Sequence, residues 1–150
     1  HVEPGLVLHH FSETETEELV RGWLSVFGAN RHGVNAKDYL WHIFSANRYP
    51  SMMGAAALIE YQQQVAVEFV VLSNDRLTAF TTDRLPAKAG FSDYYVFPRN
   101  LAWTMAFTHE AGWLGPYFAM HANYQQLRQS NLLQLRKQEE AELARLKGWC

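Results

Sequence analysis

The segments between residues 65 and 108 constrain the fold most strongly, because short apolar segments alternate there with turn residues. Residues 65–72 read VAVEFVVL, a β-branched run that predicts a central strand. The turn residues Ser-Asn-Asp separate it from a predicted partner strand at 77–82, and Pro-Arg-Asn separates two further predicted strands at 94–97 and 101–108. Large apolar and small residues alternate in 101–108, which predicts a strand with one buried face. These segments therefore predict antiparallel strands joined by short turns.

Helices are predicted near both ends of the chain. Ser12 and Glu15 have the spacing of a capping box, and apolar residues then recur at helical spacing up to Gly28. Residues 54–64 are rich in alanine and predict a short helix, and residues 124–147 predict a long helix with a thin apolar stripe. Residues 39–45, YLWHIFS, are aromatic on both faces and predict a buried strand. The expected fold class is α+β: a mainly antiparallel β-sheet flanked by helices, with a long C-terminal helix.

Length and composition limit the kind of protein this is. A chain of 150 residues predicts one domain over 1–150, with a core of about 12–123 and an extended C-terminal helix at 124–150. The net charge of −2 argues against direct binding of nucleic acid. The only cysteine, Cys150, allows no intramolecular disulfide and no thiolate zinc site. Because the sequence has no apolar run of about 18 residues and no signal-peptide pattern, we expect a cytoplasmic protein without membrane contact.

Residues 104–118, TMAFTHEAGWLGPYF, hold the most suggestive polar pair, His109 and Glu110. A metalloprotease helix needs HExxH, but Trp113 stands where the second histidine would be. Adjacent strand residues point to opposite faces, so the two side chains are expected to diverge and to bond to nearby backbone. The next residues, Gly112, Gly115 and Pro116, predict a sharp turn followed by a helix that starts at the proline.

Two further polar residues, His42 and Glu68, lie in segments that otherwise look buried. Buried polar groups need partners, so His42 with Glu68, or Glu68 with Arg76 or Arg48, is expected to form a structural pair. An acid/base pair in a cleft is the alternative interpretation. Three further histidines lack the spacing of a metal site, and we expect neither a metal nor a cofactor. These are His9, His10 and His121.

The segments YLWHIFS, SDYYVF and WTMAFTHEAGWLGPYF together resemble a bacterial family, domain of unknown function 4275, over roughly residues 36–118. The resemblance rests on two groups of residues. These are Tyr39, Leu40, Trp41, His42, Phe44 and Ser45, and then Thr108, His109, Glu110, Gly112, Trp113, Gly115, Pro116, Tyr117 and Phe118. The family has no assigned chemistry, so the resemblance implies no catalytic residue. Small cytoplasmic α+β proteins of this kind often lie beside bacterial polymorphic toxins, which implies by analogy an immunity protein, for example of a type VI secreted toxin.

The leading hypothesis is therefore a non-enzymatic binding protein that neutralises a cognate toxin, such as a nuclease. Its partner-binding residues are expected to be an acidic group and an exposed aromatic anchor, because nuclease surfaces are basic and aromatic residues dominate binding. The acidic group is Glu13, Glu15, Glu17 and Glu18, and the anchor is Trp113 or Tyr117. One alternative is a small enzyme that uses His109, Glu110 and His42 in a pocket beneath the glycine turn. The other is a structural protein that forms a homodimer through its C-terminal helix.

Overall fold

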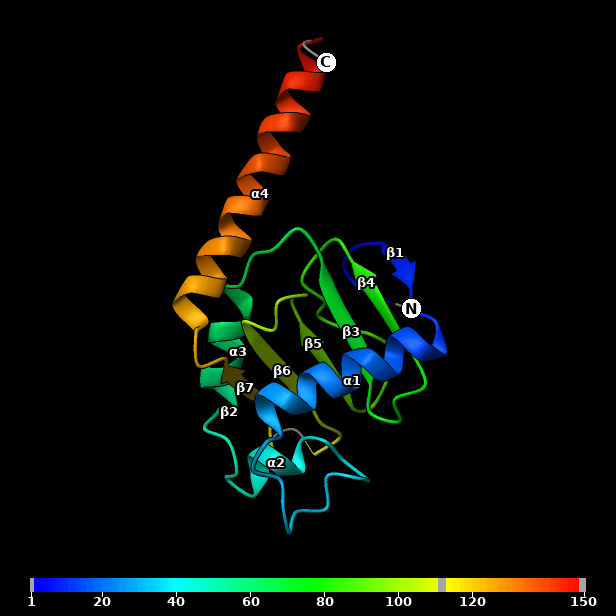
Figure 1. The fold of residues 1–150 in the computed structure, drawn as a ribbon, viewed down its shortest axis with the longest axis vertical. Coiled ribbons are helices and arrows are strands. Elements are labelled where there is room, and N and C mark those ends of the chain that lie inside the picture. The colour runs from blue at the N-terminus through cyan, green and yellow to red at the C-terminus, as the bar shows by residue number, and fades with distance from the viewer. Residues whose placement is uncertain (1, 111–112, 149–150) are drawn as a thin grey trace.

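The protein is a helix–sheet–helix domain from which one long helix projects (Figure 1). The computed structural model describes residues 2–110 and 113–148. The strands of this part are β1 (Val7–His10), β2 (Met52–Met53), β3 (Phe69–Ser73), β4 (Ala79–Thr82), β5 (Tyr94–Phe97), β6 (Trp103–Phe107) and β7 (Tyr117–Met120). The helices are α1 (Glu13–Phe27), α2 (His42–Ser45), α3 (Ala55–Gln62) and α4 (Tyr124–Leu146). The predicted α+β fold class is confirmed.

The strands form one sheet in the order β1-β4-β3-β5-β6-β7-β2, and all neighbouring strands are antiparallel. Both predicted hairpins are present as β3–β4 and β5–β6. The sheet ends on short strands: β2 has two residues, and the pairing of β1 shifts register between Val7 and His9. Neither β1 nor β2 was predicted, because the residues of β1 do not alternate between apolar and polar and β2 is too short to be recognised.

Both faces of the sheet are covered. On one face, α1 and α2 bury Trp23, Phe27 and Phe44 against the strands, and Figure 1 shows α1 crossing this face. On the other face, Ala57 and Tyr61 of α3 pack on a cluster that contains Trp103. The prediction that residues 101–108 have a single buried face is wrong for this reason, since Trp103, Thr104, Met105 and Ala106 are all buried.

The first helix forms as its sequence predicts. The Ser12 hydroxyl accepts a hydrogen bond from the Glu15 N–H at 3.1 Å, and the Glu15 carboxylate accepts one from the Ser12 N–H at 2.8 Å. This capping box satisfies backbone donors that the helix itself leaves without partners. Trp23 lies on the buried side, where its indole N–H donates to the Thr104 hydroxyl at 2.9 Å. The helix is therefore fixed both at its start and along the face that contacts β6.

Two predictions about local structure are wrong. Residues 39–45 form a turn and the short helix α2, because the N–H groups of Phe44 and Ser45 both bond back to the carbonyl of Trp41. This segment has aromatic residues on every side because it packs against both α1 and the sheet, so the pattern does not indicate a strand. Residues after Pro116 form the strand β7, because Tyr117 and Phe118 pair with β6 and β2, and this long-range pairing overrides the helix signal of the proline.

The long helix α4 packs only at its beginning. Tyr124 and Leu127 contact the core of the second face, and Asn131 is buried with its amide donating to Asn100 at 3.3 Å. Beyond this point the helix leaves the body of the domain, as Figure 1 shows, and Leu143 and Leu146 are exposed. The predicted long C-terminal helix is confirmed.

Candidate functional site

The most elaborate polar arrangement lies at the end of the β5–β6 hairpin. Asp93 directly precedes β5, and His109 follows β6 by two residues. Because Tyr94 pairs with Phe107, the hairpin register brings Asp93 and His109 together. The His109 Nδ1 atom lies 2.9 Å from each carboxylate oxygen of Asp93, and the His109 backbone N–H donates to Oδ2 at 3.2 Å. We call this arrangement the Asp93–His109 pair.

The segment before α2 contacts the Asp93 carboxylate as well. The Trp41 indole N–H donates to Asp93 Oδ2 at 2.7 Å, and Asp93 is only 7% exposed. A buried carboxylate must be compensated by hydrogen bonds, and the three donors here provide that compensation. The contact joins the segment before α2 to the hairpin end, so Asp93 fixes the position of both Trp41 and His109.

The outer side of His109 faces solvent and a second carboxylate. Its side chain is 38% exposed, and its Nε2 atom lies 3.5 Å from Glu110 Oε1. The pKa of His109 is raised, first by the hydrogen bond to Asp93 and then by the charges of Asp93 and Glu110, while partial burial opposes the shift. The expected divergence of His109 and Glu110 is wrong, because both residues lie in the turn after β6 and no longer alternate as strand residues do.

Two aromatic rings border the imidazole of His109. The ring of Tyr39 lies 5.2 Å from it and the ring of Trp41 lies 6.1 Å away. His42 borders the same group, with its ring 4.6 Å from Trp41 and 5.3 Å from Tyr39, and its Nδ1 atom is 2.7 Å from the carbonyl of Asn35. The structure thus gathers Tyr39, Trp41, His42, Asp93, His109 and Glu110 into one cluster, which we call the His109 site.

The expected pairing of His42 or Glu68 inside the sheet is wrong. Glu68 bonds to Arg99 at 2.7 Å, not to His42, Arg48 or Arg76. Glu68 precedes β3, which begins at Phe69, so its side chain does not enter the buried part of the sheet and remains 28% exposed. His42 begins α2 and is half-buried at the His109 site.

Trp113 and Tyr117, the two aromatic residues that flank Gly115 and Pro116, differ in how far they are exposed to solvent. Trp113 is 80% exposed, and its backbone N–H donates to the carbonyl of Glu110 at 3.0 Å. Tyr117 is only 3% exposed and its ring stacks 6.3 Å from Trp41, so it offers no exposed anchor. It is buried because it is the first residue of β7, which lies inside the sheet. Gly112 lies outside the described residues.

The remaining residues of this turn have a structural role. Gly115 has a φ of +102°, a conformation that side chains rarely adopt, and a Cβ atom there would stand 2.9 Å from the Thr108 hydroxyl. Thr108 in turn donates its hydroxyl proton to the carbonyl of Leu114. The peptide bond between Gly115 and Pro116 is cis, and the chain enters β7 directly after it. This turn therefore sets the direction in which β7 leaves the His109 site.

The acidic residues of α1 lie apart from the His109 site. Glu13, Glu15, Glu17 and Glu18 are all exposed. The far end of the same helix, Phe27, packs on Phe44 of α2 with ring centroids 6.4 Å apart. A helix of this length spans about 22 Å, so the first acidic residue and the end next to α2 are separated by roughly that distance. The pKa of Glu15 is lowered, chiefly by the hydrogen bond from the Ser12 backbone in the capping box.

A cavity of about 430 Å³ opens beside Asp93 and is lined in part by Tyr39, Asn74 and Ser92. Within the residues that the structure describes, no group of three or more His, Cys, Asp and Glu side chains could hold a metal ion. In the same part of the chain, no helix combines the length and apolarity needed to cross a membrane.

Sequence reasoning did not single out Asp93, although a signal was available. Both strands of the β5–β6 hairpin were predicted, and counting outward from their shared turn places Asp93 opposite the residues that follow β6. A single acidic residue directly before a buried strand, with a histidine at the matching end of the partner strand, is the pattern that indicates such a pair.

The fold and the site define an α+β domain with an Asp–His pair at the end of a central hairpin. A family model described as Domain of unknown function (DUF4275) matches residues 10–118, and the chain belongs to this family. The match takes in α1 and the whole His109 site, whereas α4 lies beyond it. Comparisons with curated proteins and with solved structures found no match.

Proposed function

We propose that this protein binds and neutralises a protein toxin as an immunity protein, through a surface centred on Trp113 and His109. The observation that carries the proposal is the 80% exposure of Trp113, whose backbone N–H bonds to the carbonyl of Glu110 in the His109 site. Tryptophan is strongly enriched among the residues that dominate protein–protein binding. An exposed indole next to a fixed polar group is the usual composition of a binding hot spot with its polar surroundings.

The His109 site suits this role because its polar groups are already ordered. Asp93 orients His109, and Trp41 orients Asp93, so binding would immobilise few additional torsion angles. The raised pKa of His109 favours the charged imidazolium, and Glu110 beside it carries a carboxylate. The surface thus offers a donor and an acceptor beside an apolar anchor, which gives a partner both affinity and orientation.

The exposed glutamates of α1 suit a second role in the same binding event. The first of them lies about the length of α1 from the helix end that packs on α2, so they would contribute long-range attraction to a basic toxin surface, such as that of a nuclease. The family resemblance supports the toxin class by analogy, because small α+β proteins of this kind often accompany bacterial toxins.

Capture of partners with tagged protein, followed by calorimetric titration of the purified partner, tests the proposal. We expect a one-to-one complex that abolishes the partner's toxic activity. Trp113→Ala is expected to weaken binding by at least about thirtyfold, since hot-spot truncations cost at least about 2 kcal/mol. Leu77→Ala is the matched control, because Leu77 is equally exposed at 80% but lies in the turn between β3 and β4. Equal affinities for wild type and Trp113→Ala would reject the proposed surface.

A second function, that of a small enzyme, is favoured by one specific observation. The Asp93–His109 pair orients an imidazole side chain that is partly exposed, as general acid/base catalysis requires, and a cavity adjoins Asp93. His109→Gln separates the two functions. An enzyme would lose turnover in this variant while retaining ligand in the cavity, whereas an immunity protein would lose toxin affinity and show no turnover before or after the change.

A further inference from the structure

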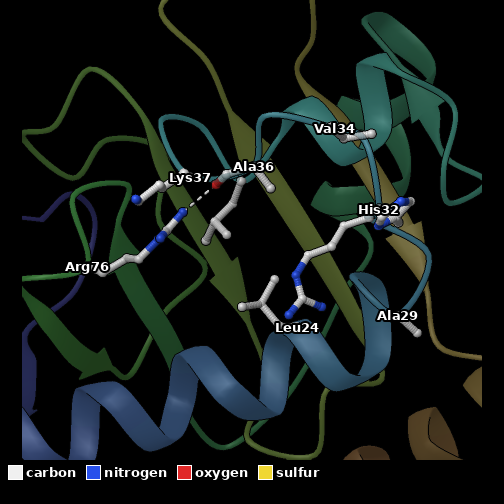
Figure 2. Close-up of a pocket in the computed structure, with 9 residues that line it drawn as sticks. Leu24, Ala29, His32, Val34, Ala36, Lys37 and Arg76 are labelled. Carbon is white, nitrogen blue, oxygen red and sulfur yellow. Dashed lines mark hydrogen bonds between the residues drawn. The ribbon is translucent and has the colours of Figure 1, made fainter.

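A second cavity, of about 550 Å³, lies between α1, the loop that follows it and the turn between β3 and β4 (Figure 2). Its apolar lining includes Leu24 of α1 and Leu40 of the loop. Figure 2 shows Arg76 and Lys37 on one side of the space and His32 on the other. This cavity shares no lining residue with the one beside Asp93, and none of its lining belongs to the His109 site.

The cavity is lined by cations without a matching carboxylate. Arg31, Lys37 and Arg76 carry three formal positive charges, His32 adds a titratable group, and no Asp or Glu is among the lining residues. The neighbouring acids are engaged elsewhere. Asp38 accepts a hydrogen bond from Asn35 at 2.8 Å, and Asp75 accepts one from Ser73 at 2.6 Å. Concentrated positive charge of this kind attracts anions.

Some of these cationic side chains already donate hydrogen bonds within the fold, but in the part of the chain that the structure describes Arg76 and Lys37 each keep a donor without a partner. Arg31 donates to the carbonyl of Gly28 at 2.7 Å, which satisfies an acceptor at the end of α1, and Arg76 donates through Nη2 to the carbonyl of Ala36. The Nε atom of Arg76 is buried and has no hydrogen-bond partner among the described residues. The ammonium group of Lys37 likewise makes no hydrogen bond or ion pair within the described residues. A buried donor without a partner is costly, and an anion in the cavity would supply the missing acceptor.

We propose that this cavity binds a small organic phosphate, with the phosphate among Arg31, Lys37 and Arg76 and an apolar body against Leu24 and Leu40. Three cations favour a dianionic phosphate over a singly charged carboxylate, and guanidinium groups match the geometry of phosphate oxygens. The cavity volume lies within the range of small-molecule sites. This ligand site rests on different residues from the proposed toxin surface.

Phenyl phosphate is a suitable probe, because it joins a phosphate to an apolar ring. Titration into ¹⁵N-labelled protein is expected to give saturable shifts of the Arg76 Nε–H signal and of the backbone amides around residues 31–37. Phenol tests the ring alone and inorganic phosphate tests the charge alone, and both are expected to bind more weakly. Absence of saturable shifts at phenyl phosphate concentrations up to about 10 mM would overturn the proposal.

Variants separate a specific site from general attraction by charge. Lys37→Met is expected to weaken binding about tenfold, the usual effect of losing one charge-assisted hydrogen bond. Lys37 is exposed and makes no contact that the fold needs, so this variant is expected to fold normally. Lys137→Met on α4 removes the same charge from an exposed site on a helix that packs against the opposite face, and is expected to leave affinity unchanged. Equal weakening by both variants would overturn the proposal.

Discussion

Replacing Asp93 with alanine tests the role of this residue most directly. The change removes the acceptor for the Trp41 indole N–H and for two donors of His109. A hydrogen bond to a charged group contributes about 1.5–3 kcal/mol, and a buried donor left without a partner costs a comparable amount. Trp41 is 2% exposed, so its bond counts in full, whereas His109 is 38% exposed and water replaces part of its loss. We expect Asp93→Ala to lower the free energy of unfolding by about 3 kcal/mol.

Denaturant unfolding followed by tryptophan fluorescence measures this change. Asp93→Asn keeps an acceptor for Trp41 and turns an amide donor toward His109 Nδ1, so its cost is expected to be about 1 kcal/mol. The same variant should shift the imidazole proton to Nε2, which ¹⁵N spectra of the ring report directly. Asp83→Ala is the control, because Asp83 is an exposed carboxylate with one bond, from Leu6 N–H at 2.8 Å. The reasoning is refuted if Asp93→Ala costs no more than Asp83→Ala.

Three further predictions concern the turn, the buried indole and pH. Gly54 also has a positive φ, of +68°, but a Cβ atom there would meet nothing within 4 Å, so Gly115→Ala is expected to destabilise the fold by about 2 kcal/mol more than Gly54→Ala, because its Cβ would stand 2.9 Å from the Thr108 hydroxyl; similar unfolding midpoints would contradict this. Thr104→Val leaves the Trp23 indole N–H without its acceptor and is expected to lower the free energy of unfolding by about 1–3 kcal/mol, as measured with denaturant. An unchanged free energy of unfolding would contradict this prediction. The pKa of His109 is raised in the folded state, so its stabilising contribution is complete below the unfolded-state pKa of about 6.5 and disappears as pH rises through the folded-state pKa. A stability difference between wild type and His109→Gln that does not change with pH would exclude this linkage.

The elements that the sequence predicted correctly have local causes. The capping box at Ser12 and the helical spacing of apolar residues specify α1 without reference to the rest of the chain. The turn residues between β3 and β4, and between β5 and β6, likewise specify hairpins over short distances. Secondary structure that depends on neighbours a few residues away was therefore accessible from sequence.

The errors have long-range causes. The segment at residues 39–45 owes its conformation to Asp93 and Tyr95, more than fifty residues away, since the Trp41 indole N–H and backbone N–H bond to them. Pro116 precedes a strand because β6 offers a partner, and no property of the proline itself indicates that. The His109 site combines three segments that pattern analysis treats separately, so Trp41 and His109 were found without Asp93, the residue that joins them.

The two edges of the sheet have a consequence for how this protein meets other molecules. One edge strand, β2, has two residues, and the other, β1, is broken by a register shift between Val7 and His9. Short and irregular edge strands give another chain too few aligned N–H and C=O groups to add a further strand. The domain is thereby protected from edge-to-edge polymerisation. A protein that binds this domain would instead contact its side chains, so specificity would depend on surface residues that substitution can change without altering the sheet.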